Sequence, residues 1–337
     1  MNAFIQSIRV ALPDTVVDND QLAREFPGWS AQKIYEKTGI RERRVSAAEE
    51  CASDLAVRAA SRLLDDEGRD RSSIDFLLNC TQTPDYVLPT TACLLQDRLG
   101  LPRSCGALDY NLGCSGYVYG LGLAKALIAS GQAREVLLVT ADTYSKLMNP
   151  LDKSVRTLFG DAATATLIRA DARETLIGPF VYGTDGSGAD NLIVPCGGMR
   201  RRHDPGAELV RDASGNARTD NDIWLNGPEI FNFTLRVIPE TVAALLQRAR
   251  LCVSEIDLFV FHQANRFILE HLRKKIGAPP EKFVFAMEHV GNTVSSSIPI
   301  ALQDARDAGR LTSGSLVMVV GFGVGYSWAA TLIRWCQ

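Results

Sequence analysis

The chain has 337 residues, 46% of them hydrophobic, and a formal net charge of −3. This length suits about two domains with a large core, and the small net charge gives no bulk attraction to nucleic acid or to an anionic membrane. The N-terminal stretch MNAFIQSIRVALPD lacks the long apolar run of a signal peptide, and no run is long enough for a transmembrane helix. We therefore expect a cytoplasmic protein that binds neither nucleic acid nor membrane.

Apolar runs alternate with amphipathic stretches from the N-terminus onward, which predicts an α/β fold with buried strands. In the first half we expect a helix over residues 51–68 and buried strands over residues 74–82 and 135–142. Another helix is expected after residue 114, although each of its glycines costs about 1 kcal/mol relative to alanine in a helix interior. Such a helix should pack its backbone closely against other elements.

The second half repeats this plan, with a helix expected over residues 227–251 and a strand over residues 256–265. The stretches SSIDFLLNCTQT and SEIDLFVFHQAN share a polar turn, an Ile-Asp pair, an apolar strand and a polar end, which indicates an internal duplication. The two halves are predicted to be residues 1–175 and 176–337. Residues 197–221 contain Arg and Asp clusters without apolar periodicity, which predicts a solvated loop or lid.

Cys114 lies where the stretch YNLGCSG leads into a helical pattern. No C-x-x-C pair is present in the chain, so neither a zinc site nor a disulfide framework is expected. A thiol at a helix N-terminus lies near free N–H groups and the positive end of the helix dipole, which lower its pKa. By position alone, a buried structural cysteine is the commoner alternative.

A catalytic cysteine usually works with a histidine, and the chain has four. His262 is expected at the carboxyl end of a predicted strand, which is where open α/β sheets bind ligands. His203 falls in the charged segment, and His271 and His289 fit surface or packing positions better. His262 is therefore the candidate partner of Cys114.

Two further segments offer hydrogen-bond donors. Asn292 follows a glycine in HVGNTVSSSIP, where it could supply an amide to a substrate or serve as a helix N-cap. The terminal segment MVVGFGVGYSWAA has glycines after an apolar strand, but the acidic residue of a dinucleotide-binding fingerprint does not follow it. Backbone N–H groups that hold an oxyanion are the better interpretation of this loop.

Cys114 in CSG, His262 in HQAN, Asn292 in GNT and the terminal GFGVGYSW occur in the order and spacing of the β-ketoacyl-ACP synthase III family of the thiolase superfamily, which the chain resembles. GIRERR, TQTPDYVLPTTACLLQ, LFGDAATATLI and GTDGSGADNLIVP extend the resemblance over nearly the whole chain. The resemblance implies a homodimer with the five-layered α-β-α-β-α thiolase fold. Its N-terminal half would carry the cysteine, and its C-terminal half the histidine and the asparagine.

The resemblance also implies an acyltransferase that condenses an acyl group on Cys114 with a malonyl thioester, expected to be malonyl-ACP, in fatty-acid initiation or a related pathway. The backbone N–H groups of Cys114 and Val324 would hold the oxyanion. His262 and Asn292 would donate hydrogen bonds to the enolate that remains after carbon dioxide leaves. Neither a metal nor an organic cofactor is expected, because the departing carboxylate supplies the driving force.

Three lysines occupy positions at which relatives that use acetyl-CoA carry a tryptophan and two arginines: Lys33, Lys37 and Lys153. Lysine keeps the charge for phosphate groups but lacks a planar stacking surface. We therefore expect weak CoA binding and a preference for acyl-ACP, unless the ring of Trp29 takes the place of the missing tryptophan.

The remaining substrate contacts implied by the resemblance concern the acyl chain and the carrier. Leu88 would reach across the dimer into the partner's acyl pocket and leave room for primers longer than acetyl, while Asn226 and Phe322 would contact the substrate. An acidic carrier protein is expected to dock on a basic patch, for which an ordinary solvated helix face is the alternative. The patch consists of Arg266, Arg273, Lys274 and Lys275.

Two other functions remain open. The first is a related enzyme of secondary-metabolite or polysaccharide biosynthesis, which would pass the acyl group to another acceptor. The second is a non-catalytic partner subunit of a larger synthase, although the complete set of Cys114, His262 and Asn292 argues against it.

Overall fold

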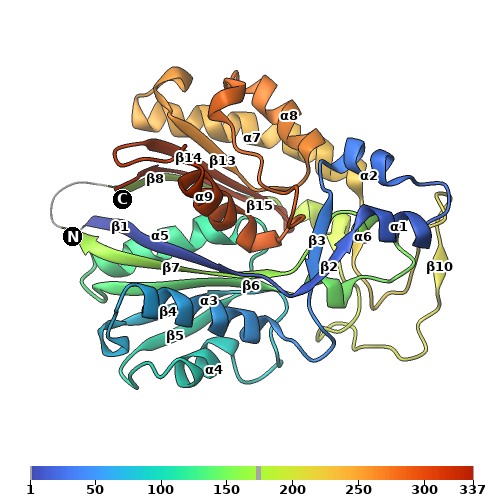
Figure 1. Cartoon of the computed structure of the whole chain (residues 1–337), viewed down its shortest axis with the longest axis horizontal. Coiled ribbons are helices and arrows are strands. Elements are labelled where there is room, and N and C mark those ends of the chain that lie inside the picture. The colour runs from blue at the N-terminus through green and yellow to red at the C-terminus, as the bar shows by residue number, and fades with distance from the viewer. Residues whose placement is uncertain (1, 172–175, 337) are drawn as a thin grey trace.

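Two β-sheets lie face to face with helices between them and on both outer sides, as Figure 1 shows. The computed structural model describes residues 2–171 and 176–336. The first sheet has the strand order β1 (Asn2–Ala11), β7 (Ala162–Asp171), β6 (Glu135–Asp142), β4 (Phe76–Cys80), β5 (Gly106–Tyr110). The second sheet has the order β13 (Leu258–Phe261), β14 (Leu316–Gly323), β15 (Ser327–Arg334), β8 (Ile177–Thr184).

Helices α5 (Gly116–Ala129) and α9 (Ser297–Asp307) fill the space between the two sheets and form one core cluster with both of them. The glycines of α5 allow the close approach that the sequence predicts. A Cβ atom on Gly120 would lie 2.6 Å from Cδ1 of Leu138 in the first sheet, and one on Gly122 would collide with Tyr182 in the second. The two sheets therefore pack directly against the backbone of α5.

The outer layers consist of two helix pairs. Helices α3 (Ala52–Asp66) and α4 (Thr91–Arg98) cover the first sheet, and α7 (Gly227–Ala249) and α8 (Arg266–Lys275) cover the second. The order of layers is α-β-α-β-α, as the resemblance implied. Among the described residues, no helix has both the length and the apolar character needed to cross a membrane.

Strand β6 has the bounds that the sequence predicts, and all eight of its residues are buried. The other predicted elements are present but shorter: β4 ends at Cys80 and β13 ends at Phe261, where the predicted strands continue into polar residues. These polar residues, 81–82 and 262–265, lie in the loops that follow the two strands. The predicted boundary between residues 175 and 176 adjoins residues 172–175, which lie outside the described part of the chain, so it stays a prediction.

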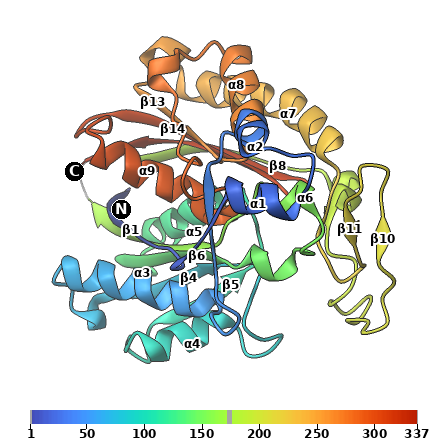
Figure 2. The ribbon, with the colours of Figure 1, turned by 45° about the vertical axis from the view of Figure 1, so that its right-hand side comes forward.

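The shorter elements lie at the right-hand end of the sheets in Figure 1, and Figure 2 brings this end towards the viewer. They are β2 (Thr15–Asp18), α1 (Asn19–Glu25), α2 (Ala31–Thr38), β3 (Glu42–Val45), α6 (Lys153–Arg156), β9 (Leu192–Ile193), β10 (Val210–Arg211), β11 (Ala217–Arg218) and β12 (Trp224–Leu225). Residues 197–221 are mostly exposed, but the prediction of a plain loop is incomplete, because β10 and β11 pair as an antiparallel hairpin. The backbone N–H of Ala217 donates to Leu151, which holds the hairpin near α6.

Candidate active site

Cys114 lies between β5 and α5, in a turn that is pressed against the end of β14. Its side chain is 5% exposed. A Cβ atom on Gly321 would lie 2.8 Å from the Cys114 carbonyl oxygen, and one on Gly323 would lie 3.0 Å from Sγ. The glycines of the GFG segment are therefore required by the close passage of β14 over the thiol.

The pKa of Cys114 shifts in the opposite direction to the one that the sequence predicts. Burial raises the pKa of the thiol to about 12, the charge of Asp142 acts in the same direction, and the residue's own backbone N–H opposes them only weakly. Helix α5 begins at Gly116 with Ser115 as its N-cap, so Cys114 precedes the first turn. Desolvation thus opposes the effect expected from the position before the helix and favours the neutral thiol.

His262 follows the last residue of β13 and is 2% exposed. Its backbone N–H donates to Val320 over 2.8 Å, and its Nδ1 lies 2.7 Å from Oγ of Ser297. The same Oγ accepts the Gln263 N–H over 3.3 Å, and its own proton is available to donate to Nδ1. This arrangement favours the tautomer with its proton on Nε2, the nitrogen that could donate to a ligand.

The environment also keeps His262 uncharged. Burial lowers the pKa of the imidazole from 6.5 to about 3, and a hydrogen bond with the Val294 backbone opposes this shift only partly. Phe322 packs edge-on against the imidazole, with ring centroids 5.5 Å apart and an interplanar angle of 84°. Because Phe322 and Gly323 are consecutive, the end of β14 contacts both His262 and Cys114.

Asn292 is tied by its backbone to the segment that precedes β7. Its N–H donates to Leu158 over 2.8 Å, and its carbonyl oxygen accepts from Gly160 over 3.0 Å. The side-chain Oδ1 accepts the N–H of Val294 over 3.0 Å, which leaves the amide Nδ2 to act as a donor. The alternative of an N-cap for α9 is wrong, because Ser296 occupies that position.

Val294 is a constituent of the site that the sequence analysis missed. It is fully buried, belongs to the same apolar cluster as Cys114, and has a φ of 53°. A β-branched residue is strained in this left-handed region. Among the described non-glycine residues only Val294 and Arg250 have positive φ. Nothing in the local sequence marks a valine for this conformation.

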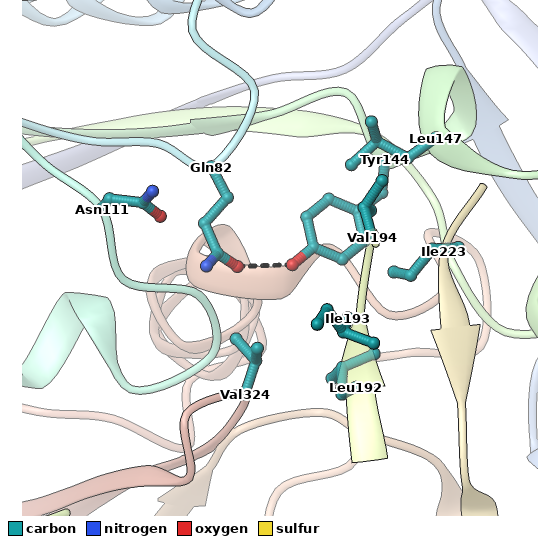
Figure 3. A pocket seen from close by; sticks show the side chains of 9 residues that line it. All are labelled: Gln82, Asn111, Tyr144, Leu147, Leu192, Ile193, Val194, Ile223 and Val324. Carbon is teal, nitrogen blue, oxygen red and sulfur yellow. Dashed lines mark hydrogen bonds between the residues drawn. The ribbon is translucent and has the colours of Figure 1, made fainter. Parts of the chain in front are cut away.

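A cavity of about 180 Å³ lies beside the turn that carries Cys114, and Figure 3 shows the side chains that line it. A Cβ atom on Gly113, the residue before Cys114, would lie 2.7 Å from Cγ1 of Val324 and would collide with the Gln82 amide. Leu88 does not line this cavity in its own chain; it is 83% exposed. The cavity is lined by Gln82, Asn111, Tyr144, Leu147, Leu192, Ile193, Val194, Ile223 and Val324.

The three lysines that the sequence predicts as CoA contacts lie near the ring of Trp29. The ammonium groups of Lys33 and Lys37 lie 5.2 Å and 4.7 Å from the centroid of the Trp29 ring. Trp29 and Lys153 also line a common cavity of about 470 Å³ beside the β10–β11 hairpin, and Lys153 donates a hydrogen bond to the Ser214 carbonyl. An aromatic surface is thus present among the three lysines, at a position four residues before Lys33.

Asn226 is the N-cap of α7, so its side chain has a structural partner. Its Oδ1 accepts from the Glu229 N–H over 3.5 Å, and its Nδ2 donates to Oδ1 of Asn191 over 3.0 Å. Phe322, the other predicted substrate contact, packs against the histidine ring. Both side chains therefore have partners within the fold.

The basic residues predicted for carrier docking lie on α8, but most of them have partners within the fold. Arg273 pairs with Glu270 over 2.9 Å, Lys275 donates to the Leu235 carbonyl over 2.7 Å, and Arg266 lies over the Phe285 ring. Lys274 is exposed.

The same helix presents an exposed aromatic group. Phe267 is 53% exposed, and its ring lies against the rings of Phe231 and His271. The surface beside the basic residues is therefore partly apolar. Within the part of the chain that the structure describes, no group of three or more His, Cys, Asp or Glu side chains is arranged to hold a metal ion.

The burial of His262 predicts a pH dependence of stability. The unfolded chain binds a proton at this residue as the pH falls through 6.5, whereas the folded chain does not until about pH 3. The free energy of unfolding should therefore decrease by about 2 kcal/mol between pH 7 and pH 5 because of this residue alone. In His262→Ala this part of the decrease should vanish, while the exposed His203→Ala should retain it. Parallel curves for wild type and His262→Ala, measured by denaturant unfolding, would contradict the buried neutral imidazole.

The contact between β14 and the thiol predicts the effect of one added methyl group. In Gly323→Ala the new Cβ would lie 2.9 Å from Cβ of Cys114, so the thiol must move. Because a displacement of about 1 Å can cost on the order of 10² in rate, acylation of Cys114 by an acyl thioester should slow by that factor. The control is Gly198→Ala, whose Cβ meets no atom within 4 Å. Equal acylation rates for both variants, followed by intact-protein mass, would refute this contact.

Comparison with known proteins agrees with this geometry. Models of the 3-oxoacyl-[acyl-carrier-protein] synthase III family match residues 108–186 and, for its C-terminal part, residues 246–335. A β-ketoacyl-[acyl-carrier-protein] synthase III of Symbiobacterium thermophilum is 38% identical and covers 98% of this chain and 97% of its own length.

Two solved structures are also similar over almost the whole chain. A 3-oxoacyl-(acyl-carrier-protein) synthase III crystal structure has 53% identity and a TM-score of 0.98, covering 99% of this chain and 100% of that one. A 3-oxoacyl-(acyl-carrier protein) synthase of Burkholderia xenovorans has 39% identity and a TM-score of 0.92, covering 100% and 95%. The chain thus has the predicted thiolase fold, and it belongs to the 3-oxoacyl-ACP synthase III family of condensing acyltransferases.

Proposed function

We propose that the chain condenses an acyl group held on Cys114 with malonyl-ACP, with loss of carbon dioxide, to give a 3-oxoacyl-ACP. The observation that carries this proposal is the meeting of Cys114 and His262 at the end of β14, with Asn292 tied to the adjoining segment. This arrangement supports a buried site in which Cys114 would be the nucleophile and His262 and Asn292 would be uncharged hydrogen-bond donors.

In the first half-reaction, Sγ of Cys114 forms a bond to the carbonyl carbon of the acyl thioester. The bond from that carbon to the carrier sulfur breaks, and the proton of the Cys114 thiol leaves with the departing thiol. We assign the backbone N–H groups of Cys114 and Val324 to the oxyanion of this step. The exchange creates no net charge, which suits a site whose burial favours neutral groups.

In the second half-reaction, the bond between the malonyl carboxylate and its α-carbon breaks, and the electron pair passes to the thioester oxygen as an enolate. The Nε2–H of His262 and the Nδ2–H of Asn292 donate to that oxygen. The enolate carbon then attacks the acyl carbonyl, the bond to Sγ breaks, and the released Cys114 sulfur takes one proton from water. Loss of carbon dioxide drives the step, so we propose that no metal or organic cofactor takes part.

We further propose that the chain acts as a homodimer. The loop after β4 exposes three consecutive apolar side chains, Tyr86, Val87 and Leu88. Strand β5 is at the edge of the first sheet and exposes Leu108. An apolar loop tip and an unpaired edge strand are features that association covers, and Leu88 would then enter the acyl cavity of the partner.

The carrier protein is the proposed partner of α8. Lys274 offers positive charge to an acidic carrier, and Arg266, Arg273 and Lys275 add to the local potential although they also have partners within the fold. Lys33, Lys37 and Lys153 are proposed to contact the phosphate groups of the incoming thioester, and the Trp29 ring offers a stacking surface to CoA. With malonyl-ACP as substrate, the proposed site of action is the cytoplasm.

The proposed function can be tested by measuring the two half-reactions separately in variants of the site residues. For wild type, carbon dioxide and 3-oxoacyl-ACP should form in equal amounts from the acyl-enzyme and malonyl-ACP. His262→Ala or Asn292→Ala should slow carbon dioxide release by about 10²–10³ while acylation of Cys114 changes little, because their donors face the second substrate. Cys114→Ala is the control that cannot be acylated.

Two outcomes would contradict the proposal. Equal losses in both half-reactions would remove the assigned roles of His262 and Asn292. Departure of the acyl group from Cys114 to another acceptor without release of carbon dioxide would instead identify a different transferase.

The size of residue 88 should set the length of the primer. Leu88→Phe adds volume at the proposed wall of the partner's cavity, so the preferred acyl chain should become shorter. The control is Leu209→Phe, because Leu209 is also an exposed leucine but lies in the segment before β10. The measurement compares acylation rates for two- to eight-carbon thioesters, and an unchanged profile in Leu88→Phe would exclude this residue from the cavity.

A further inference from the structure

The cavity beside Cys114 has one polar wall. Figure 3 shows the carboxamide of Gln82 between Asn111 and the hydroxyl of Tyr144, while aliphatic side chains line the rest. A cavity that receives only alkyl chains gains nothing from this wall, because an amide removed from water without a partner costs free energy. The polar wall therefore calls for a ligand with a hydrogen-bonding group.

The hydrogen bonds of Gln82 leave one group unused. The backbone N–H donates to Oδ1 of Asp142 over 2.8 Å, and the side-chain Oε1 accepts from the Tyr144 hydroxyl over 2.5 Å. Within residues 2–171 and 176–336, no oxygen accepts from Nε2. Both N–H bonds of this nitrogen are thus available to an acceptor in the cavity.

The position of this donor is fixed from several sides. The ring of Tyr144 packs against Phe159 with centroids 5.2 Å apart. Asp142, which holds the Gln82 backbone, also accepts a hydrogen bond from Ser295 over 2.5 Å. The Gln82 amide touches Gly113, the residue before the nucleophile. The Nε2 donor of Gln82, held in this position, can form a hydrogen bond with a substituent on the acyl group that Cys114 carries.

We propose that the primer is an acyl group of about four to six carbons with a neutral oxygen substituent, a hydroxyl or a keto group, that accepts a hydrogen bond from Nε2 of Gln82. The proposal rests on the acylation of Cys114 put forward above. The volume of the cavity supports the proposed length of the acyl group. A cavity of about 150 Å³ is large enough for a six-carbon ring, and this cavity has a volume of about 180 Å³.

Charge supports a neutral substituent rather than a carboxylate. No lysine or arginine lines the cavity. The Asp142 carboxyl lies directly behind Gln82, and when ionised it would repel a second carboxylate in this poorly solvated place. A hydroxyl or keto oxygen satisfies the free donor without that penalty.

The test uses acyl groups on N-acetylcysteamine, which has neither an adenine nor a carrier protein. The probes are hexanoyl, 3-hydroxyhexanoyl and 5-oxohexanoyl thioesters, and the rate of acylation of Cys114 is followed by intact-protein mass. In wild type at least one oxygenated probe should react about tenfold faster than hexanoyl, the usual scale of a buried hydrogen bond. Gln82→Met, similar in length but without the amide, should abolish this ratio.

Two further variants keep the test decisive if Gln82→Met fails to fold. Tyr144→Phe removes the bond that orients the amide and should reduce the ratio, whereas Ile223→Val, on the aliphatic wall, should preserve it. A hexanoyl rate equal to or above both oxygenated rates in wild type would overturn the proposal. So would a preference that survives in Gln82→Met. No acylation by any probe, hexanoyl included, would instead refute the proposed function and this inference with it.

Discussion

The removal of Cys114 from water is the constraint on which the chemistry of this site depends. Burial raises the pKa of the thiol to about 12 and lowers that of the His262 imidazole to about 3, so it favours the neutral form of both groups. Burial thus disfavours a cysteine–histidine ion pair in the resting site, and hydrogen-bond donors that face the reacting oxygens are the means by which the site can stabilise the charge of the transition states. The same low polarity favours loss of carbon dioxide from a malonyl carboxylate, because the charge becomes spread as the bond breaks.

Close backbone packing makes this desolvation possible. Gly321 and Gly323 let β14 pass directly over the turn that carries Cys114, and Phe322 between them packs edge-on against the imidazole of His262. The turn that presents Asn292 is held against the segment before β7 by two backbone hydrogen bonds, and Val294, two residues later, has a positive φ. The site thus exists only where the two sheets and the helices between them meet.

The sequence predicts features that depend on a local pattern of residues, but it does not predict features that depend on how deeply a side chain is buried in the fold. The bounds of β6 and the close packing of α5 follow from apolar runs and glycine spacing. The prediction that Cys114, His262 and Asn292 act together came from the family resemblance, because no spacing in the sequence shows which distant residues meet. The pKa of Cys114 was predicted with the wrong sign, since desolvation depends on β14, some 200 residues later in the chain. The bond between Gln82 and Tyr144 joins residues 62 positions apart and had no local signal.

The ionisation of Cys114 in the free protein tests this account most directly. The measurement is the ultraviolet absorbance of thiolate as a function of pH, taken as the difference between wild type and Cys114→Ala so that the other cysteines cancel. An uncharged resting site predicts no thiolate from this residue between about pH 5 and pH 9, because its pKa lies well above the ordinary value for cysteine. A thiolate signal with its midpoint near or below pH 7 would contradict the account and would restore an activated cysteine at the helix N-terminus.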